Sequence, residues 1–250
     1  MRLVGAEVLK LVRRRGLMAW SLVLTVGAVV VADGVLLILH AANSAKHGPA
    51  GGASNLMHLV DLLSGLGAVA AIMIGATGGS QDVSNGVFRD LVVTGRSRAT
   101  LFAVRIPGAL LVYLPMLLAA FGLAVAGSYA FAGGLPHPTG SDLRGYVEYL
   151  IAIGVVNLIL AVALAAFVSS RVVVGVLIAW NAIVAHILLQ IGSLGNIRKG
   201  IDIAAAEHFA PARLASQQVV MSTLTALAVL VAWALVFSGA GRWWTTRRDA

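Results

Sequence analysis

The chain has 250 residues, of which 59% are apolar and 11% are charged, and its mean hydropathy is +0.93. Ordinary globular proteins are about 45–50% apolar and about 25% charged, so a soluble enzyme and a disordered chain are both excluded. The net charge of +8 would suggest nucleic acid in a soluble protein, but the basic residues here stand at the ends of apolar segments. Membrane topology explains that placement, so we expect contact with membrane lipids and not with nucleic acid.

Residues 1–16 are expected to form an amphipathic helix in the membrane interface. Its apolar positions recur at helical spacing and are Leu3, Val4, Val8, Leu11 and Val12. Charged residues mostly take the other face: Arg2, Glu7, Lys10, Arg13 and Arg14. Such a helix lies parallel to the membrane with its basic side toward anionic headgroups. The alternative is a charged stub that precedes the first span.

Six apolar runs are long enough to cross a bilayer of about 30 Å. They cover approximately residues 17–40, 59–79, 106–131, 147–168, 172–195 and 219–239. The first is longer than the core of a signal peptide, so we expect it to be retained. Only residues 169–171 separate the fourth from the fifth, which predicts a tight helical hairpin. Because lipid satisfies no backbone hydrogen bonds, the sequence predicts an all-α polytopic membrane protein with a single transmembrane domain over 1–250.

Small residues recur four positions apart in several runs, for example at Gly75 and Gly79 or at Ala161 and Ala165. This spacing permits helices to approach closely, but it assigns no particular interface in a chain so rich in alanine.

The distribution of lysine and arginine predicts the orientation. Thirteen of the 18 basic residues lie in the N-terminal segment, in the loop between spans two and three, in the 169–171 turn and in the C-terminal tail. The other side of the membrane receives five. Both termini are therefore expected to be cytoplasmic. The preference for arginine over lysine, with abundant Ala, Gly and Val, indicates a GC-rich bacterial gene, and hence a multi-pass protein of the bacterial inner membrane.

Four polar residues within or beside the spans are candidates for function: Asp33, Asp61, Asn181 and His186. An ionisable group in a membrane is expensive to bury and is a functional candidate for that reason. The two acids could belong to a proton- or metal-binding cluster, although their spacing matches no ligand motif. Alternatively, Asp33 faces a wet cavity or a polar partner. Asn181 and His186 are expected to form interhelical hydrogen bonds rather than to bind a ligand.

Motifs that would make this chain an enzyme are missing from the sequence. It has no G-x-x-x-x-G-K-[ST] phosphate-binding loop, no H-E-x-x-H zinc motif and no G-x-S-G protease motif. We therefore expect no catalytic residue, no metal site and no cofactor in this chain.

The loop 81–105 between spans two and three carries the most information. Val87, Phe88, Leu91 and Val92 fall on one face of a short helix, and Gly95 supplies a stop. A short helix that exposes Phe and Leu at the cytosolic surface is typical of a docking element for a partner protein.

This arrangement resembles the permease subunits of the ABC-2 exporter family. The family loop has an acid, a glycine four residues later, a short amphipathic stretch, a Pro-x-Ser-Arg-like turn and a basic residue that begins span three. The matching positions here are Asp82, Gly86, Phe88, Leu91, Ser97, Arg98 and Arg105. The chain departs from the pattern with Gly95 in place of a common Pro, Val87 in place of Thr, and Ser84 in place of a second acid.

The resemblance implies a permease that works as a dimer with a second copy or a paralogue, driven by two copies of a separate cytosolic ABC ATPase that binds ATP and Mg. It implies that the loop contacts the ATPase through Asp82, Gly86, Phe88, Arg89, Asp90, Leu91, Arg96 and Arg98. It also implies that the external segment 196–216 forms a gate before the last span, with an apolar stripe of Ile197, Ile201, Ala204 and Ala205. An ordinary surface loop is the alternative for that segment.

Two other functions remain open at this point. One is a membrane scaffold or immunity protein without transport activity. The other is a secondary transporter, which would need charged sites near the bilayer midplane and usually shows repeat symmetry. The sequence does not identify the cargo.

Overall fold

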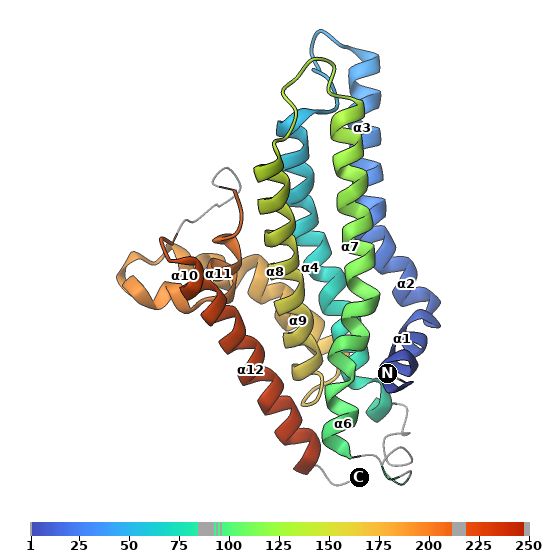
Figure 1. Cartoon of the computed structure of the whole chain (residues 1–250), viewed down its shortest axis with the longest axis vertical. Helices are drawn as coiled ribbons and strands as arrows, with labels where there is room; N and C mark the ends of the chain where they lie inside the picture. Colours follow the sequence, from blue (N-terminus) through green and yellow to red (C-terminus); the bar gives the residue numbers. More distant parts are fainter. Residues whose placement is uncertain (1, 85–92, 94, 96, 212–218, 248–250) are drawn as a thin grey trace.

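The structure, a computed structural model, describes residues 2–84, 93, 95, 97–211 and 219–247. The described residues form helices and no strand (Figure 1). In chain order the helices are α1 (Arg2–Val12), α2 (Arg15–Leu22), η1 (Val23–Gly27), α3 (Ala28–Ala42), α4 (Gly52–Ser84), α6 (Arg98–Ala103), α7 (Arg105–Ala130), α8 (Gly140–Leu164), α9 (Ser170–Ala179), η2 (Trp180–Val184), α10 (Ala185–Gln190), η3 (Gly192–Gly200), α11 (Asp202–Glu207) and α12 (Thr223–Arg247).

Six helical segments are long and apolar enough to cross a membrane, which confirms the all-α polytopic fold. They are Arg15–Ala42, Gly52–Asp82, Arg98–Ala130, Gly140–Leu164, Ser170–Gln190 and Thr223–Arg247. Their ends differ from the hydropathy boundaries because polar residues also enter the helices. The fourth begins at Gly140, and not at 147, because Thr139 and Asp142 form a capping box there. The sixth continues to Arg247 because the tryptophans and basic residues after 239 stay helical.

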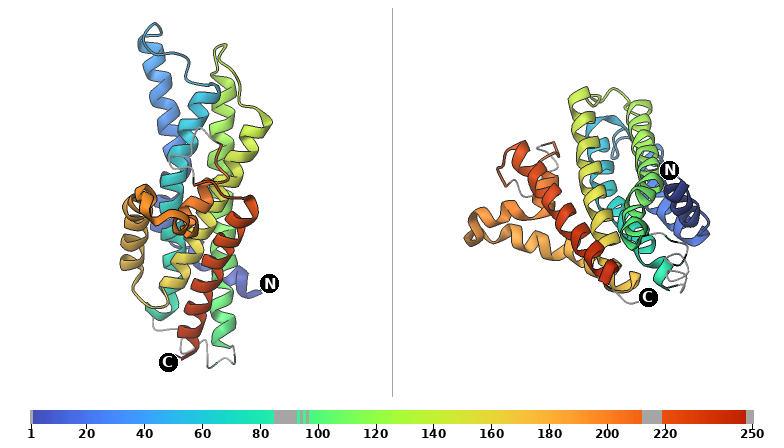
Figure 2. Two further views of the ribbon diagram at one scale, coloured as in Figure 1. Left: turned by 90° about the vertical axis from the view of Figure 1, so that its left-hand side faces the viewer. Right: turned by 60° about the horizontal axis from the view of Figure 1, so that its bottom comes forward.

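The helices α3, α4, α7 and α8 form the tall part of the molecule, while α9 to α12 occupy a shorter flank (Figure 1). Figure 2 shows this flank beside α8 and away from α2. The chain descends in α8 and returns in α9, as predicted for the hairpin. Two thirds of the most apolar window of α4 is buried, at 67%, against 11% in the first and last spans. α4 is therefore the central helix, and the first and last spans present their apolar surface outward.

The contact between α4 and α8 depends on glycine. A methyl group added to Gly75 would lie 2.6 Å from the Leu158 carbonyl oxygen, and one added to Gly79 would lie 2.5 Å from the Val162 carbonyl oxygen. Backbone therefore meets backbone along this line, with the Cβ atoms of Ala161 and Ala165 packed beside the two glycines. The small-residue spacing that the sequence left unassigned is the α4–α8 interface.

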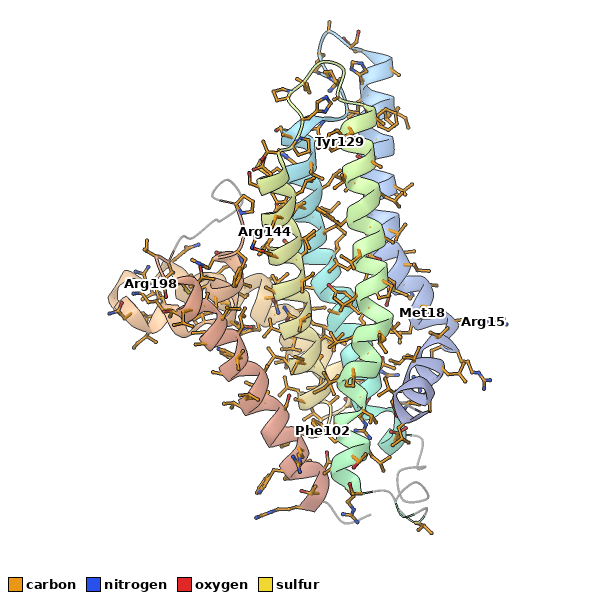
Figure 3. All side chains as sticks on the ribbon, viewed as in Figure 1. Arg15, Met18, Phe102, Tyr129, Arg144 and Arg198 are labelled. Atoms are coloured by element: carbon orange, nitrogen blue, oxygen red, sulfur yellow. The ribbon has the colours of Figure 1, made fainter. Side chains whose placement is uncertain are left out.

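One end of the bundle, which we call the base, carries both chain termini together with α1 and α6 (Figure 1). Figure 3 places Phe102 near the base and Tyr129 near the opposite end. The connections 43–51 and 131–139 close that opposite end, where the Tyr129 hydroxyl donates to the Pro138 carbonyl oxygen at 2.9 Å. The described parts of the segments that hold most of the basic residues therefore gather at one end.

The helix α1 exists, but it presents different faces from those expected. Leu11 is fully buried against the bundle, while Leu9 and Val12 are exposed at 51% and 45%. Glu7 is only 8% exposed, and Lys10 pairs with a carboxylate of α4. The assignment of Glu7 and Lys10 to a headgroup-facing side is wrong, because buried partners within the bundle take up their charges.

The segment after span five folds into η3 and α11, and the rest of the expected gate, at 212–216, lies outside the described residues. Ile201, Ala204 and Ala205 are buried, as the predicted stripe requires. Ile197 is 72% exposed and does not belong to the stripe. The reason is local: Ile197 lies in the 3₁₀ turn η3, and the chain is extended at Ile201 before α11 begins, so the two do not share a helical face.

Candidate functional site

Four charged side chains form a buried cluster at the base. Asp82, near the end of α4, accepts from two cations: Lys10 Nζ lies 2.7 Å from Oδ1 and Arg105 Nη2 lies 3.0 Å from Oδ2. Lys10 also pairs with Glu7, with Nζ 2.6 Å from Oε2. We call Glu7, Lys10, Asp82 and Arg105 the base ion cluster.

The cluster is balanced in charge and nearly closed to solvent. Arg105 is 1% exposed and Asp82 is 3% exposed. Arg105 Nη1 also donates to the Gly79 carbonyl oxygen at 2.7 Å. Taking such groups from water costs several kcal/mol per ion unless pairs and hydrogen bonds compensate, so a geometry with two cations against two carboxylates is what permits their burial.

This cluster joins three elements. Glu7 and Lys10 come from α1, Asp82 from α4 and Arg105 from the first position of α7. α1 also approaches α7 closely, because a methyl group added to Gly108 would lie 2.6 Å from Glu7 Cβ. Asp82 and Arg105 stand at the two ends of the predicted docking loop. The loop therefore leaves from, and returns to, one ionic joint.

Two of the residues predicted to contact a partner are described. Asp82 belongs to the base ion cluster, and Arg98 begins α6, which Ser97 caps by accepting from the Thr100 amide at 3.1 Å. The remaining predicted contacts lie outside the described residues: Gly86, Phe88, Arg89, Asp90, Leu91 and Arg96.

A second candidate site is a cavity of about 350 Å³ between α4, α8, the fifth span and α11. Its polar lining comprises Asp61, Ser64, Tyr149, Asn181, His186 and Glu207. Its apolar lining is mainly Val69, Ile72, Ile153, Ile178 and Ile203. We call this space the acidic cavity. It unites three of the four polar residues that the sequence selected, namely Asp61, Asn181 and His186.

Asn181 forms interhelical hydrogen bonds, as predicted. Its amide exchanges two hydrogen bonds with that of Asn157 on α8, at 2.7 and 3.1 Å. Each amide also donates to a backbone carbonyl of its own helix, Asn157 to Ile153 and Asn181 to Leu177. His186 does not follow the same prediction, because its Nδ1 atom is buried without a hydrogen-bond partner.

Two tryptophans anchor α11 beside the cavity. Trp180 Nε1 donates to Asp202 Oδ1 at 3.0 Å, and Trp233 Nε1 donates to the Gly200 carbonyl oxygen at 2.8 Å. The two indole rings lie 5.9 Å apart. Asp202 is fully buried, and burial raises the pKa of its carboxyl above the usual range. These contacts fix the start of α11 and so place Glu207, at its end, in the cavity wall.

Asp33 belongs to neither site. Its carboxylate packs over Gly127 of α7, where an added methyl group would meet Oδ2 at 2.7 Å. In the part of the chain that the structure describes, no three His, Asp or Glu side chains gather in a group able to hold a metal ion. The hypothesis of a cluster that joins Asp33 to Asp61 therefore has no geometric support.

Sequence reasoning missed four contributors to the sites. Glu7 and Lys10 were assigned to the lipid surface, and Tyr149 and Glu207 were not selected. A helical wheel could not have assigned Glu7 and Lys10 to this cluster, because it separates the polar face of a helix from the apolar face but does not show which groups the polar face contacts. Glu207 carried one usable signal, since it is an acid that closes a short apolar stretch, 203–206.

Comparison with known proteins does not extend these assignments. Neither family models nor curated proteins give a match to this chain.

Proposed function

We propose that this chain is the membrane-spanning permease subunit of an ATP-driven ABC-2 type exporter, oriented with both termini in the cytoplasm of a bacterial cell. Three features support the proposal: the six-span helical fold, the gathering of basic segments at the base, and the resemblance of the loop 81–105. The base ion cluster is the observation that carries it.

The cluster explains how a moving loop could act on the membrane. A partner that displaces the loop pulls on Asp82 at one end and on Arg105 at the other. Asp82 of α4 pairs with Arg105 of α7 and with Lys10 of α1. The displacement would therefore reach all three helices together. A loop attached through mobile surface residues would not pass its displacement on to the helices. ATP and Mg would be held by the ATPase, and this chain would transmit the displacement of the loop to its spans.

The export path would lie between two permease copies. The mouth of the acidic cavity is formed by residues of spans two and five that are exposed in the single chain, Asp61, Gly65 and Ala182. The resemblance to ABC-2 permeases implies a path lined by spans one, two and five, so two of these three spans contribute to this mouth. A second copy facing this mouth would enclose the cavity and convert it into part of a central route.

The test is to look for a gene that encodes an ABC ATPase next to the gene for this chain and to reconstitute the two proteins together. We expect the two proteins to co-purify in a two-to-two complex and inverted vesicles that contain both to accumulate cargo only with hydrolysable ATP. Phe88→Ala should abolish pull-down or export because aromatic anchors dominate interface energy, while Arg89→Ala should be milder. Full export by the chain alone would instead indicate a secondary transporter. The absence of both export and ATPase binding would favour a scaffold.

Topology can be tested independently. Reporter fusions after residues 45 and 205 should both report the outside of the cell. A cytoplasmic signal from the second fusion would contradict the six-span orientation.

A further inference from the structure

We infer that the groove between α8 and α12 holds one acyl chain of a phospholipid whose headgroup carries a primary amine. The groove has a volume of about 550 Å³, and we call it the α8–α12 groove. Such a site goes beyond the proposed function, because it depends on the fold and not on what the chain transports.

Two apolar strips form the walls of the groove. One runs along α8 from Ile151 to Ile159 and the other along α12 from Leu227 to Ala234. Within each strip the lining positions are three and four residues apart, so they share one face of their helix. Among the described residues that line the groove, Glu148 at its end is the one with a charge.

The groove exists because α8 and α12 diverge. Near the base the two helices touch, since a methyl group added to Gly241 would lie 3.1 Å from the Cα atom of Ala163. From there α12 leans away from α8 toward its other end (Figure 1). At that end the chain after α11 returns to α8, where a methyl group added to Gly145 would lie 3.1 Å from Pro211 Cγ. The groove is therefore closed toward the base and bordered at the opposite end.

The groove covers one half of the bilayer. No charged residue occurs between Glu148 and Arg171, so these two residues mark the limits of the hydrocarbon along this part of the chain. The groove extends from Glu148 to Ile159, which is about 16 Å of α8 at 1.5 Å per residue. Half of a hydrocarbon core is about 15 Å. The groove thus has the length of an acyl chain in the leaflet opposite the base.

The width of the groove suits a single extended chain and not a helix of a second copy. A volume of about 550 Å³ along that length corresponds to a mean cross-section of about 33 Å². A helix with its side chains is at least 10 Å across and would need about 80 Å². Water is a poor occupant because it needs several polar partners, which the apolar strips do not offer. A lipid tail meets both requirements.

Two charged side chains stand where the headgroup of that lipid would lie. Arg144 Nε donates to Glu148 Oε1 at 2.7 Å, and both side chains are exposed. This pairing leaves the Nη groups of Arg144 for a phosphate and Oε2 of Glu148 for an ammonium. A primary ammonium donates hydrogen bonds to a carboxylate, whereas a quaternary ammonium has no N–H to donate. The charges therefore favour phosphatidylethanolamine over phosphatidylcholine and over the anionic phosphatidylglycerol.

Native mass spectrometry of the purified full chain tests the site without ATP or any partner. The chain is delipidated in detergent and titrated separately with the palmitoyl-oleoyl forms of phosphatidylethanolamine, phosphatidylcholine and phosphatidylglycerol. We expect one phosphatidylethanolamine per chain to bind about two- to fivefold more tightly than either other lipid, the range for an ion pair at exposed side chains.

The variants test the walls and the charge separately. Ala234→Trp fills the groove at its inner end and should weaken binding at least tenfold, because two buried methylenes already correspond to that factor. Ala119→Trp makes the same change at an exposed position of α7 outside the groove, and should leave binding unchanged. Glu148→Gln should retain one bound lipid and abolish the preference for phosphatidylethanolamine over phosphatidylcholine. Because Glu148 is exposed, this variant keeps the test valid if Ala234→Trp impairs folding.

Equal binding of the three lipids, unchanged binding in Ala234→Trp, or an equal loss in Ala119→Trp would overturn the inference. So would parent dimers that carry no lipid and dissociate in Ala234→Trp, because a second copy would then cover the groove. None of these outcomes depends on an ATPase. Failure of the exporter proposal would leave the lipid site standing, and loss of the lipid site would leave ATP-driven export untouched.

Discussion

Removing the carboxylate of Asp82 should be among the most destabilising single changes in this protein. Asp82→Asn removes the carboxylate that pairs with the guanidinium of Arg105, a side chain that is only 1% exposed. Loss of one partner from a buried pair costs about 3–5 kcal/mol. Lys10→Met removes a cation whose side chain is 21% exposed; Asp82 keeps Arg105, but Glu7, which is 8% exposed, loses its cation, so we expect an intermediate loss of about 1–3 kcal/mol. Asp82→Asn combined with Arg105→Met removes both charges and should recover most of the stability.

The free energies can be measured by reversible unfolding in mixed micelles with increasing dodecyl sulfate, followed by tryptophan fluorescence. Asp82→Asn and the double variant belong to a double-mutant cycle, which Arg105→Met alone completes, and Lys10→Met is measured beside the cycle. We expect the losses of the two single variants to exceed that of the double variant by at least about 2 kcal/mol. Strictly additive losses, or an Asp82→Asn variant as stable as Lys10→Met, would refute the view that the base ion cluster acts as one joint.

Three further predictions concern stability and use the same assay. Gly79→Ala should cost about 1–3 kcal/mol because its methyl group would meet backbone at 2.5 Å, whereas Gly175→Ala, with nothing within 4 Å, should be neutral or stabilising. Asn157→Leu, at a fully buried position, should cost about 1–3 kcal/mol by stranding the Asn181 amide, and Asn181→Leu added to it should restore part of that loss. Asp202 has a raised pKa when folded, so the folded state holds its proton more tightly than the unfolded state does. The contribution of Asp202 to the free energy of unfolding should therefore fall as the pH rises from about 4 through the raised pKa of its carboxyl. Asp202→Asn should remove this pH dependence, and a variant with the same pH profile of stability as the parent would contradict this account.

The sequence predicted the membrane-spanning architecture because that depends on local composition. Twenty or so apolar residues in succession must be helical in lipid whatever they pack against, so the six spans could be found without tertiary information. Their ends could not be placed as well, because a capping box such as that of Thr139 and Asp142 lengthens a helix beyond its apolar part. The glycines at 75 and 79 indicated close packing, but their partner on α8 is fixed only by the fold.

The sites depended on contacts that no local pattern contains. Asn181 was correctly expected to bond across helices because an amide in a membrane needs a partner. Lys10 and Glu7 were misplaced because a charged face at a membrane surface can meet headgroups or a buried carboxylate, and only the tertiary structure distinguishes the two. The acidic cavity needed Glu207, which lies 146 positions beyond Asp61 in the chain and reaches it only because two tryptophans hold α11 in place.

The π turn η2 has a consequence for how span five can be altered. In an α-helix each residue advances by about 100°, so side chains five positions apart, such as Asn181 and His186, would point about 140° away from each other. A π turn pairs each residue with the one five positions on and brings such side chains toward the same side. Deleting one residue between Asn181 and His186 would restore α-helical winding and leave the two side chains four positions apart, about 40° from each other and still on one side. Span five should therefore accept the loss of one residue at this point, whereas the same five-residue spacing in an unbroken α-helix would turn one of the two side chains away from the cavity.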